Sequence, residues 1–376
     1  MKLKNEKLII AVMIFFIILN IWISIKASQQ VQRTDLSAFY YAAKVVLDRN
    51  IPDNEVYNLD TMLSVSASYG IENRPMPFVY SLATAYIMSP IALIPFKDAK
   101  LVWNLLGVIF YLGAVTIFLR LGKASNLWFA GGVTIMLSWM PFGYSQVWLQ
   151  SNALLIFLIA LAVLAAVKDR PFISGFLIGI ASLFKIFPLA FAVYLGLKNW
   201  RITAACAAVF IASFLIPGSF EWFPAIQKIH SYGNSGIRTP IYTCLYQYSH
   251  IWFLLYAILV TGITALIFYR NRNVDYLILL SFAIPATFLV NPFVDYHHLT
   301  MLALSYSYIV SGVEKFPRWF FYTSITSFVF IDAAVVYFPY INPISPIVMT
   351  GVFLLWISFC FIFLTKSNYT GLFENS

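Results

Sequence analysis

The chain has 376 residues, of which 61% are hydrophobic and only 10% are charged, and its formal net charge is +9. Soluble domains average about 45–50% apolar and about 25% charged residues, so this composition excludes an ordinary soluble protein and predicts a surface that mostly faces lipid. The basic residues stand singly or in pairs between apolar segments, which indicates membrane topology and lipid headgroups as their partners and no nucleic acid.

The first apolar segment, residues 8–26, follows Lys2, Lys4 and Lys7. A cleaved signal peptide begins in the same way, but this run is long and no clean small-residue cleavage site follows it. We therefore expect a retained first membrane span.

Residues 27–100 are expected to form one long extracytoplasmic loop with amphipathic or juxtamembrane helices. Its apolar stretch 78–95 contains Pro90 and Pro95. Counting that stretch as a span would place the basic pair near residues 120–123 outside and break the charge alternation. We therefore expect 78–95 to lie along the outer leaflet.

Asp35 directly follows the first span, at the start of the helical pattern 33–47. An aspartate at this place is a typical helix N-cap, because its side chain accepts hydrogen bonds from free backbone N–H groups. A carboxylate near the outer boundary beside an apolar wall also suits a general base. The two interpretations are compatible.

The apolar pattern predicts an all-α, polytopic membrane protein with about twelve spans, forming one unit over 1–376. The candidate segments are 8–26, 101–120, 127–142, 152–167, 172–184, 187–197, 202–217, 251–269, 276–291, 298–312, 319–338 and 345–365. Alternation from a cytoplasmic N-terminus puts every short loop with two basic residues inside, which is the positive-inside pattern of a plasma (inner) membrane protein with a cytoplasmic C-terminus.

Residues 172–197 are expected to form a hairpin, because the basic loops on both sides of it lie inside. The break falls before Pro188, where proline disrupts a continuing helix. Lys185 stands at this break among apolar neighbours. Its side chain either reaches toward the interface or binds a lipid-linked phosphate as a point charge.

Gln150 and Asn152 stand at the outer start of the segment 152–167. They are candidates for hydrogen bonds to sugar hydroxyls, and ordinary capping of the helix is the alternative. The second extracytoplasmic loop, 218–250, carries Asn234 and Arg238 among its polar residues.

The segment 291–298, NPFVDYHH, gathers Asp295, His297 and His298. A metal site is one interpretation, because histidine and aspartate both serve as ligands. A third histidine or a cysteine at suitable spacing is missing, so a phosphate- or sugar-binding cluster is favoured. Asp332, inside the segment 319–338, either pairs with a neighbouring helix or lines a cavity.

Several motifs occur in an order that resembles a known family. These are D-x-x-x-F-Y-Y-A-A from Asp35 to Ala43, Val56-Tyr57, F-V-Y-S at 78–81, Q-x-N-A-L-L at 150–155, the hairpin S-G-F-L-I-G-I-A-S-L-F-K-I-F-P at 174–188, Asn234, and the pair His297–His298. Over about residues 8–310 this order resembles glycosyltransferase family 87, whose members are GT-C-type integral membrane enzymes using polyprenyl-phosphate sugars. The chain departs from the family pattern at Ser81-Leu82, where a double proline is usual, and at Leu149, where glycine is common.

The resemblance implies an inverting transferase that moves a hexose, with mannose favoured, from a polyprenyl-phosphate donor to a glycolipid or cell-envelope glycan on the extracytoplasmic face. Asp35 would be the catalytic base and Lys185 would hold the donor phosphate. Substrate-binding residues would be Tyr80, Gln150, Asn152, Asn234, Arg238, His297 and His298. No cofactor is expected, and a metal ion stays open.

Two other functions remain open at this stage. A lipid or polysaccharide flippase would need functional charges near the middle of the membrane, where Lys185 and Asp332 are the only candidates. A non-catalytic membrane scaffold is the other. Convergence of Asp35, Lys185 and the histidine pair on one cavity would favour the transferase.

Overall fold

The computed structural model describes residues 2–29, 34–69, 76–232, 245, 249–271, 273–291, 294–337 and 346–365. Every regular element in these ranges is a helix, which confirms the all-α prediction. The first half comprises α1 (Lys2–Gln29), α2 (Asp35–Leu47), η1 (Asp53–Tyr57), α3 (Leu59–Ser68), α4 (Leu82–Ile87), η2 (Ser89–Leu93), α5 (Phe96–Leu121), α6 (Asn126–Leu137), α7 (Met140–Val147), α8 (Asn152–Val167), α9 (Pro171–Phe184) and α10 (Pro188–Gly196). The second half comprises α11 (Trp200–Ala212), η3 (Ser213–Leu215), η4 (Ser219–Glu221), α12 (Trp222–Tyr232), α14 (His250–Arg270), α15 (Tyr276–Val290), η5 (Tyr296–Met301), α16 (Leu302–Ser311), α17 (Arg318–Tyr337) and α18 (Pro346–Leu364).

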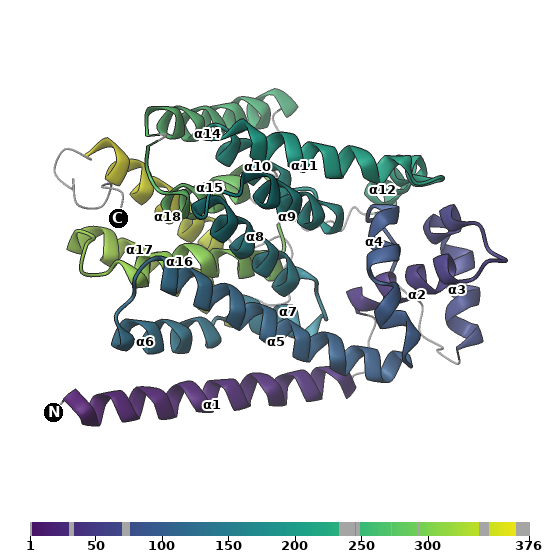
Figure 1. The fold of residues 1–376 in the computed structure, drawn as a ribbon, viewed down its shortest axis with the longest axis horizontal. Coiled ribbons are helices and arrows are strands. Elements are labelled where there is room, and N and C mark those ends of the chain that lie inside the picture. The colour runs from purple at the N-terminus through teal and green to yellow at the C-terminus, as the bar shows by residue number, and fades with distance from the viewer. Residues whose placement is uncertain are drawn as a thin grey trace.

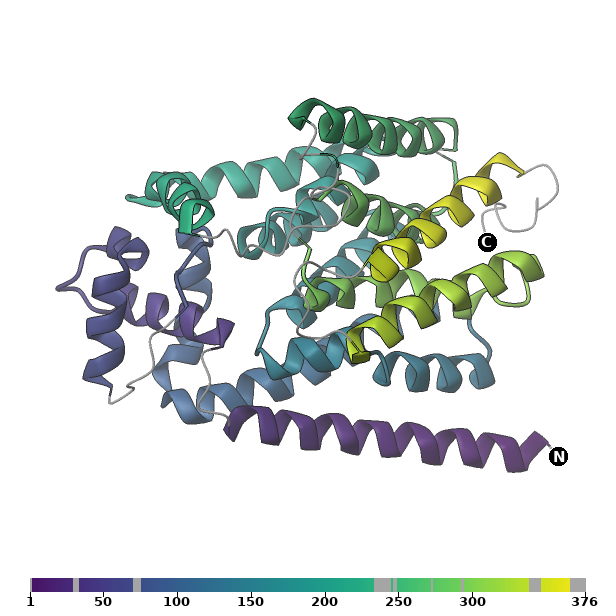
Figure 2. The same cartoon turned by 180° about the vertical axis from the view of Figure 1, so that it is seen from behind.

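Most of the long helices form one bundle, and α1 runs along its edge (Figure 1). The short helices α2, α3 and α4 gather with α12 at one end of the bundle, remote from the N-terminus. The view from behind shows the same grouping (Figure 2). The chain therefore builds a small helical cap at the end of the bundle where α1 ends.

Four helices are long and apolar enough to cross a membrane: α1, α5, α14 and α18. A fifth span results if Trp200–Leu215 and Ser219–Gln227, which meet at 106°, count as one. The helices α6, α8, α9 and α15 are apolar but shorter than 18 residues. These lengths fit a membrane protein, whereas the number of about twelve spans stays a prediction.

Residues 78–95, which were not counted as a span, form the short helices α4 and η2 and no single long helix. Among the segments predicted as spans, residues 127–142 divide into α6 and α7, with Pro141 in the first turn of α7. The segment 298–312 starts as the 3₁₀ helix η5 before α16 begins. In residues 127–142 a proline near a helix start marks the break, as its missing N–H and fixed φ require.

The chain turns back between α9 and α10, as the basic loops predict. The guanidinium of Arg201 lies 6.0 Å from the ring centre of Phe172, in the first turn of α9. A Cβ on Gly196, at the end of α10, would lie 1.7 Å from the Thr203 hydroxyl oxygen. Both ends therefore lie beside the start of α11, and Lys185 stands at the tip between the two arms.

Buried amides tie α1 to the bundle. Asn20 Nδ2 donates to the Leu137 carbonyl at 3.0 Å, and Gln146 Nε2 donates to Ser24 Oγ at 2.8 Å. Asn104 of α5 donates to the Gln146 carbonyl at 3.2 Å. Because unpaired polar groups are costly in an apolar interior, these bonds fix how α1, α5 and α7 sit against one another.

The close contact between α9 and α11 depends on glycine. A Cβ on Gly175 would lie 2.2 Å from the Ile202 carbonyl oxygen. Because that oxygen belongs to the backbone of α11, it cannot move aside without displacing the helix.

We expect Gly175→Ala to destabilise the protein by roughly 1–3 kcal/mol and to lower its Tm in detergent. Gly262→Ala in α14 is the matched control, since its Cβ would meet no atom within 4 Å. Equal Tm values for the two variants would contradict this packing.

Candidate functional site

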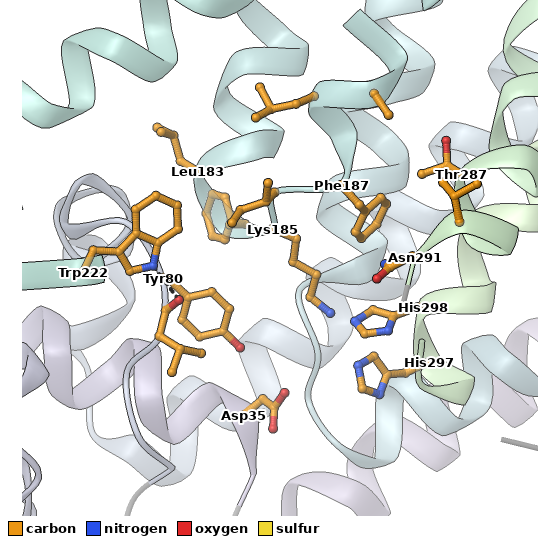
Figure 3. A pocket seen from close by; sticks show the side chains of 16 residues that line it. Asp35, Tyr80, Leu183, Lys185, Phe187, Trp222, Thr287, Asn291, His297 and His298 are labelled. Atoms are coloured by element: carbon orange, nitrogen blue, oxygen red, sulfur yellow. Dashed lines mark hydrogen bonds between the residues drawn. The ribbon is translucent and has the colours of Figure 1, made fainter. Parts of the chain in front are cut away.

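A cavity of about 650 Å³ lies where the start of α2, the tip between α9 and α10, and η5 meet (Figure 3). Part of its wall is polar and the rest is apolar. The polar lining comprises Asp35, Tyr80, Lys185, Thr287, Asn291, His297 and His298. The apolar lining comprises Val79, Leu183, Phe184, Ile186, Phe187, Leu189, Ala190, Trp222 and Val290.

Asp35 is the first residue of α2, and Thr34 occupies the N-cap position. The N-cap interpretation of Asp35 is therefore wrong. Its backbone N–H donates to the Trp148 carbonyl at 3.2 Å, and its carboxylate accepts a hydrogen bond from Gln150 Nε2. The side chain is left to face the cavity.

The surroundings of Asp35 have opposing effects on its acidity. Burial raises the pKa of the Asp35 carboxyl above its ordinary value, and the nearby positive charges of His297 and Lys185 and the hydrogen bond from Gln150 offset part of that rise. A carboxylate with a raised pKa is a stronger base than an exposed one. The carboxylate is thus suited to accept a proton from a bound hydroxyl.

Lys185 follows the last residue of α9 in extended backbone, with its side chain directed into the cavity (Figure 3). Its Nζ donates to Asn152 Oδ1 at 3.0 Å and to Gln150 Oε1 at 3.4 Å. These bonds hold the ammonium at the site and do not fit a side chain that reaches away to the membrane boundary. The same bonds give Gln150 and Asn152 a role in holding the Lys185 side chain.

The side-chain amide oxygens of Gln150 and Asn152 both accept hydrogen bonds from the Lys185 ammonium. The helix α8 begins at Asn152, and its N-cap Ser151 makes no side-chain capping bond. Gln150 donates to Asp35 and accepts from Lys185, so one amide side chain connects the carboxylate to the ammonium. Neither amide caps α8, and the capping alternative is wrong.

The two histidines lie at the start of η5. Asp295 caps this helix by accepting from Tyr296 N at 2.6 Å, while its own N–H donates to His298 Nδ1 at 2.8 Å. An accepting Nδ1 leaves the proton of a neutral His298 on Nε2, which makes that nitrogen a donor.

His297 is oriented by its neighbours. Its Nδ1 lies 3.2 Å from Asp295 Oδ2, and its ring is parallel to that of Tyr144 at 6.4 Å between centroids. Burial alone would raise the pKa of Asp295, but His297, the Tyr296 N–H and Lys185 together hold it below the ordinary value. Asp295 is therefore an anion beside the His297 ring.

Val79 and Tyr80 line the cavity, and Tyr80 lies on the side opposite His297 and His298 (Figure 3). Tyr80 stacks on Phe39 with 4.3 Å between ring centroids, and its carbonyl accepts from the Tyr57 hydroxyl at 3.1 Å. The indole N–H of Trp222 donates to the Val79 carbonyl at 2.8 Å. Trp222 thereby joins α12 to this wall and forms part of the apolar lining of the cavity.

Of the residues predicted for the site, Asp35, Tyr80, Lys185, His297 and His298 line the cavity, and Gln150 and Asn152 contact Lys185. Asn234 and Arg238 lie outside the described residues. Trp222 and Thr287 also line the cavity, and no sequence motif marks them. Trp222 reaches the cavity through the bend before α12, and Thr287 reaches it through the packing of α15.

Asp332 lies elsewhere. Its Oδ1 accepts from the backbone N–H of Met140 at 2.8 Å, so it caps α7 from the neighbouring helix α17. Of its two interpretations, pairing with a neighbouring helix is confirmed. Within the described ranges, no group of three His, Cys, Asp or Glu side chains is arranged to hold a metal ion.

Comparison with known proteins identifies the family of this chain. The model of glycosyltransferase family 87 matches residues 78–292. Over 158 residues the chain is 34% identical to the polyprenol-phosphate-mannose-dependent alpha-(1-2)-phosphatidylinositol pentamannoside mannosyltransferase of Mycolicibacterium smegmatis, which is 39% of this chain and 36% of that protein. The Mycobacterium tuberculosis protein of the same name is 33% identical over 187 residues, 46% of this chain and 41% of the relative.

The matched part thus spans about two fifths of the length of these curated relatives. The family match is broader, since residues 78–292 make up more than half of this chain and include the cavity-lining Tyr80, Lys185 and Asn291. The motif order, the all-helical fold and the match over residues 78–292 together show that this chain belongs to glycosyltransferase family 87.

Proposed function

We propose that this protein transfers mannose from a polyprenyl-phosphate donor to a hydroxyl of a glycolipid or cell-envelope glycan, with inversion at the anomeric carbon. One observation carries the proposal. A carboxylate, Asp35, and a cation, Lys185, line the same cavity together with an apolar surface, and Gln150 connects the two charged groups. The donor and sugar in this proposal are those of the two mycobacterial relatives, which are polyprenol-phosphate-mannose-dependent mannosyltransferases.

In this proposal Asp35 accepts the proton of the acceptor hydroxyl as its oxygen attacks the anomeric carbon. The bond from that carbon to the phosphate oxygen breaks, and polyprenyl phosphate leaves with the electron pair. Lys185 and the Nε2–H of His298 stabilise the charge that develops on the phosphate. His297, with Asp295 behind it, contacts the sugar or the acceptor, and Tyr80 shapes the opposite wall.

The remaining predicted contacts belong to the same proposal. Asn234 and Arg238, from the loop 218–250, would complete the sugar and phosphate contacts. The apolar lining from Leu183 to Ala190 would accept the prenyl chain near the phosphate. This scheme uses no cofactor, and it leaves a role for a metal ion open.

We also propose a GT-C-like bundle of about twelve spans in the plasma (inner) membrane, with both termini cytoplasmic and the site extracytoplasmic. The short helices α2, α3 and α4 lie at the end of the bundle where α1 finishes, remote from the N-terminus (Figure 1). Asp35, the first residue of α2, lines the cavity. The chain near the N-terminus contains Lys2 and Lys4. The positive-inside rule places those lysines in the cytoplasm.

The function is tested with labelled polyprenyl-phosphate mannose in proteoliposomes that contain the purified protein and a glycolipid acceptor. Formation of a glycosidic product is expected. Translocation of the labelled lipid without product would favour the flippase alternative.

Asp35→Asn tests the base. The amide keeps the shape of the carboxylate but does not accept the proton, so kcat should fall by about 10²–10⁴-fold. Asp48→Asn is the matched control, since Asp48 is exposed at the other end of α2. Circular dichroism and Tm should match the unmodified protein for both variants. Full activity in Asp35→Asn would rule out this mechanism.

The pH profile tests the ionisation of Asp35. A base acts in its ionised form, so activity should be lost as pH falls through the raised pKa of the Asp35 carboxyl. The acid limb of kcat/KM should therefore lie above 3.8, the ordinary value for aspartate. An acid limb at or below that value would contradict the burial of this group.

Lys185→Met tests the cation. Hydrogen bonds to charged groups contribute about 1.5–3 kcal/mol, so kcat/KM for the donor should fall by roughly 10–150-fold. Lys97→Met, an exposed lysine at the start of α5, is the control. If both variants retain donor kinetics, Lys185 does not contact the phosphate.

A further inference from the structure

The turn that follows α7 has a defined hydrogen-bond pattern. Gln150 N donates to the Ser145 carbonyl at 2.9 Å, and Leu149 N donates to the Gln146 carbonyl at 3.1 Å. With Leu149 at φ 52°, this is a Schellman motif, which ends a helix with one residue in the left-handed conformation. Glycine is the usual residue there, because a Cβ in that conformation is crowded by the backbone.

Leucine is an unusual residue to find in this conformation. In the part of the chain that the structure describes, the other non-glycine residues with positive φ are Lys123 and Asp169. Both are exposed and both end helices in the same manner, whereas Leu149 is 1% exposed. A bulky residue held at positive φ requires surrounding contacts that stabilise it, and such residues gather at functional sites.

The contacts that stabilise this turn come from α5 and α2. Trp103 Nε1 donates to the Leu149 carbonyl at 3.2 Å, and Asn104 Nδ2 donates to the Gln146 carbonyl at 3.2 Å. Asp35 N donates to the Trp148 carbonyl at 3.2 Å. The carbonyls left free by the end of α7 are thus paired with groups from other helices, as buried helix ends require.

The turn determines the direction of Gln150. Its side chain donates to the Asp35 carboxylate and accepts from Lys185 Nζ, so it has to enter the space between two groups from α2 and from the α9–α10 tip. A Leu149 in helical or extended backbone would redirect the chain at Gln150 and separate this amide from both partners. The left-handed backbone conformation of Leu149 therefore controls the contacts that Gln150 makes with Asp35 and with Lys185.

We propose that Trp103, through its indole N–H bond to the Leu149 carbonyl, is a positioning residue that holds the left-handed turn and directs Gln150 to Asp35 and Lys185. The proposal rests on the transferase function proposed above. Trp103 itself does not line the cavity and is 8% exposed, so it acts only through the turn.

Trp103→Phe tests this role because it removes the N–H and keeps most of the ring. We expect the Gln150 amide to lose its hydrogen bond to the charged Asp35 carboxylate. Loss of such a bond should lower kcat by roughly tenfold. The acid limb of the pH profile should move to higher pH, because Asp35 loses the donor that favours its ionised form. The other charged groups that face Asp35 are His297, Lys185 and Asp295, and this substitution leaves them in place.

Two further variants separate positioning from a general loss of packing. Trp356→Phe removes a buried indole bond to Thr264 Oγ1, and neither residue lines the cavity, so both kcat and the pH profile should stay unchanged. Leu149→Gly in the Trp103→Phe background should restore most of the rate, since glycine adopts the left-handed conformation without Trp103. Failure of this rescue, or an unshifted acid limb in Trp103→Phe, would overturn the proposal.

A substrate-free measurement distinguishes this proposal from the proposed function. Infrared difference spectra against Asp35→Asn follow protonation of the Asp35 carboxyl with pH. The midpoint should rise in Trp103→Phe and return in the double variant, even if the protein transfers no mannose. If Trp103→Phe does not fold, 3-benzothienylalanine at position 103, which keeps the indole shape without the N–H, gives the same comparison, and an unchanged midpoint there refutes the role.

Discussion

One amide side chain governs the arrangement of the site. Gln150 donates to Asp35 and accepts from Lys185, so it satisfies a carboxylate and an ammonium without a direct ion pair between these two described residues. Opposite charges in an apolar surrounding otherwise tend to pair with each other. By holding them apart, Gln150 leaves both facing a cavity where a hydroxyl and a phosphate can bind.

The rest of the structure supports this arrangement at the ends of helices. Asp35 starts α2, Lys185 ends α9, the histidines open η5, and Gln150 follows the end of α7. Helix ends carry free backbone polar groups, and in a bundle made of apolar helices they are the places where polar side chains can be satisfied. Buried amides of α5 and α7 hold the end of α7, from which Gln150 follows, against α1 and α5.

The agreement between sequence and structure is closest where local chemistry decides. The segments 152–167 and 172–184 coincide with α8 and α9 within one residue, because a basic loop, a proline or a polar run ends each one. The segment 127–142 appeared continuous because its apolar character does not change. Pro141 marks its division into α6 and α7 locally, but the cap that Asp332 supplies to α7 comes from 192 positions away, and no local pattern contains that contact.

The sequence by itself determined a helical membrane protein, the hairpin tip with Lys185, and a set of polar residues at segment ends, because lipid burial and helix termination leave their marks in neighbouring residues. The tertiary structure alone decided which of those residues meet. The partners Asp35 and Gln150 are 115 positions apart, the carbonyl of the left-handed Leu149 accepts from an indole of α5, and Trp222 lines the cavity after a 106° bend. Such contacts follow from how helices pack, and packing involves the whole chain at once.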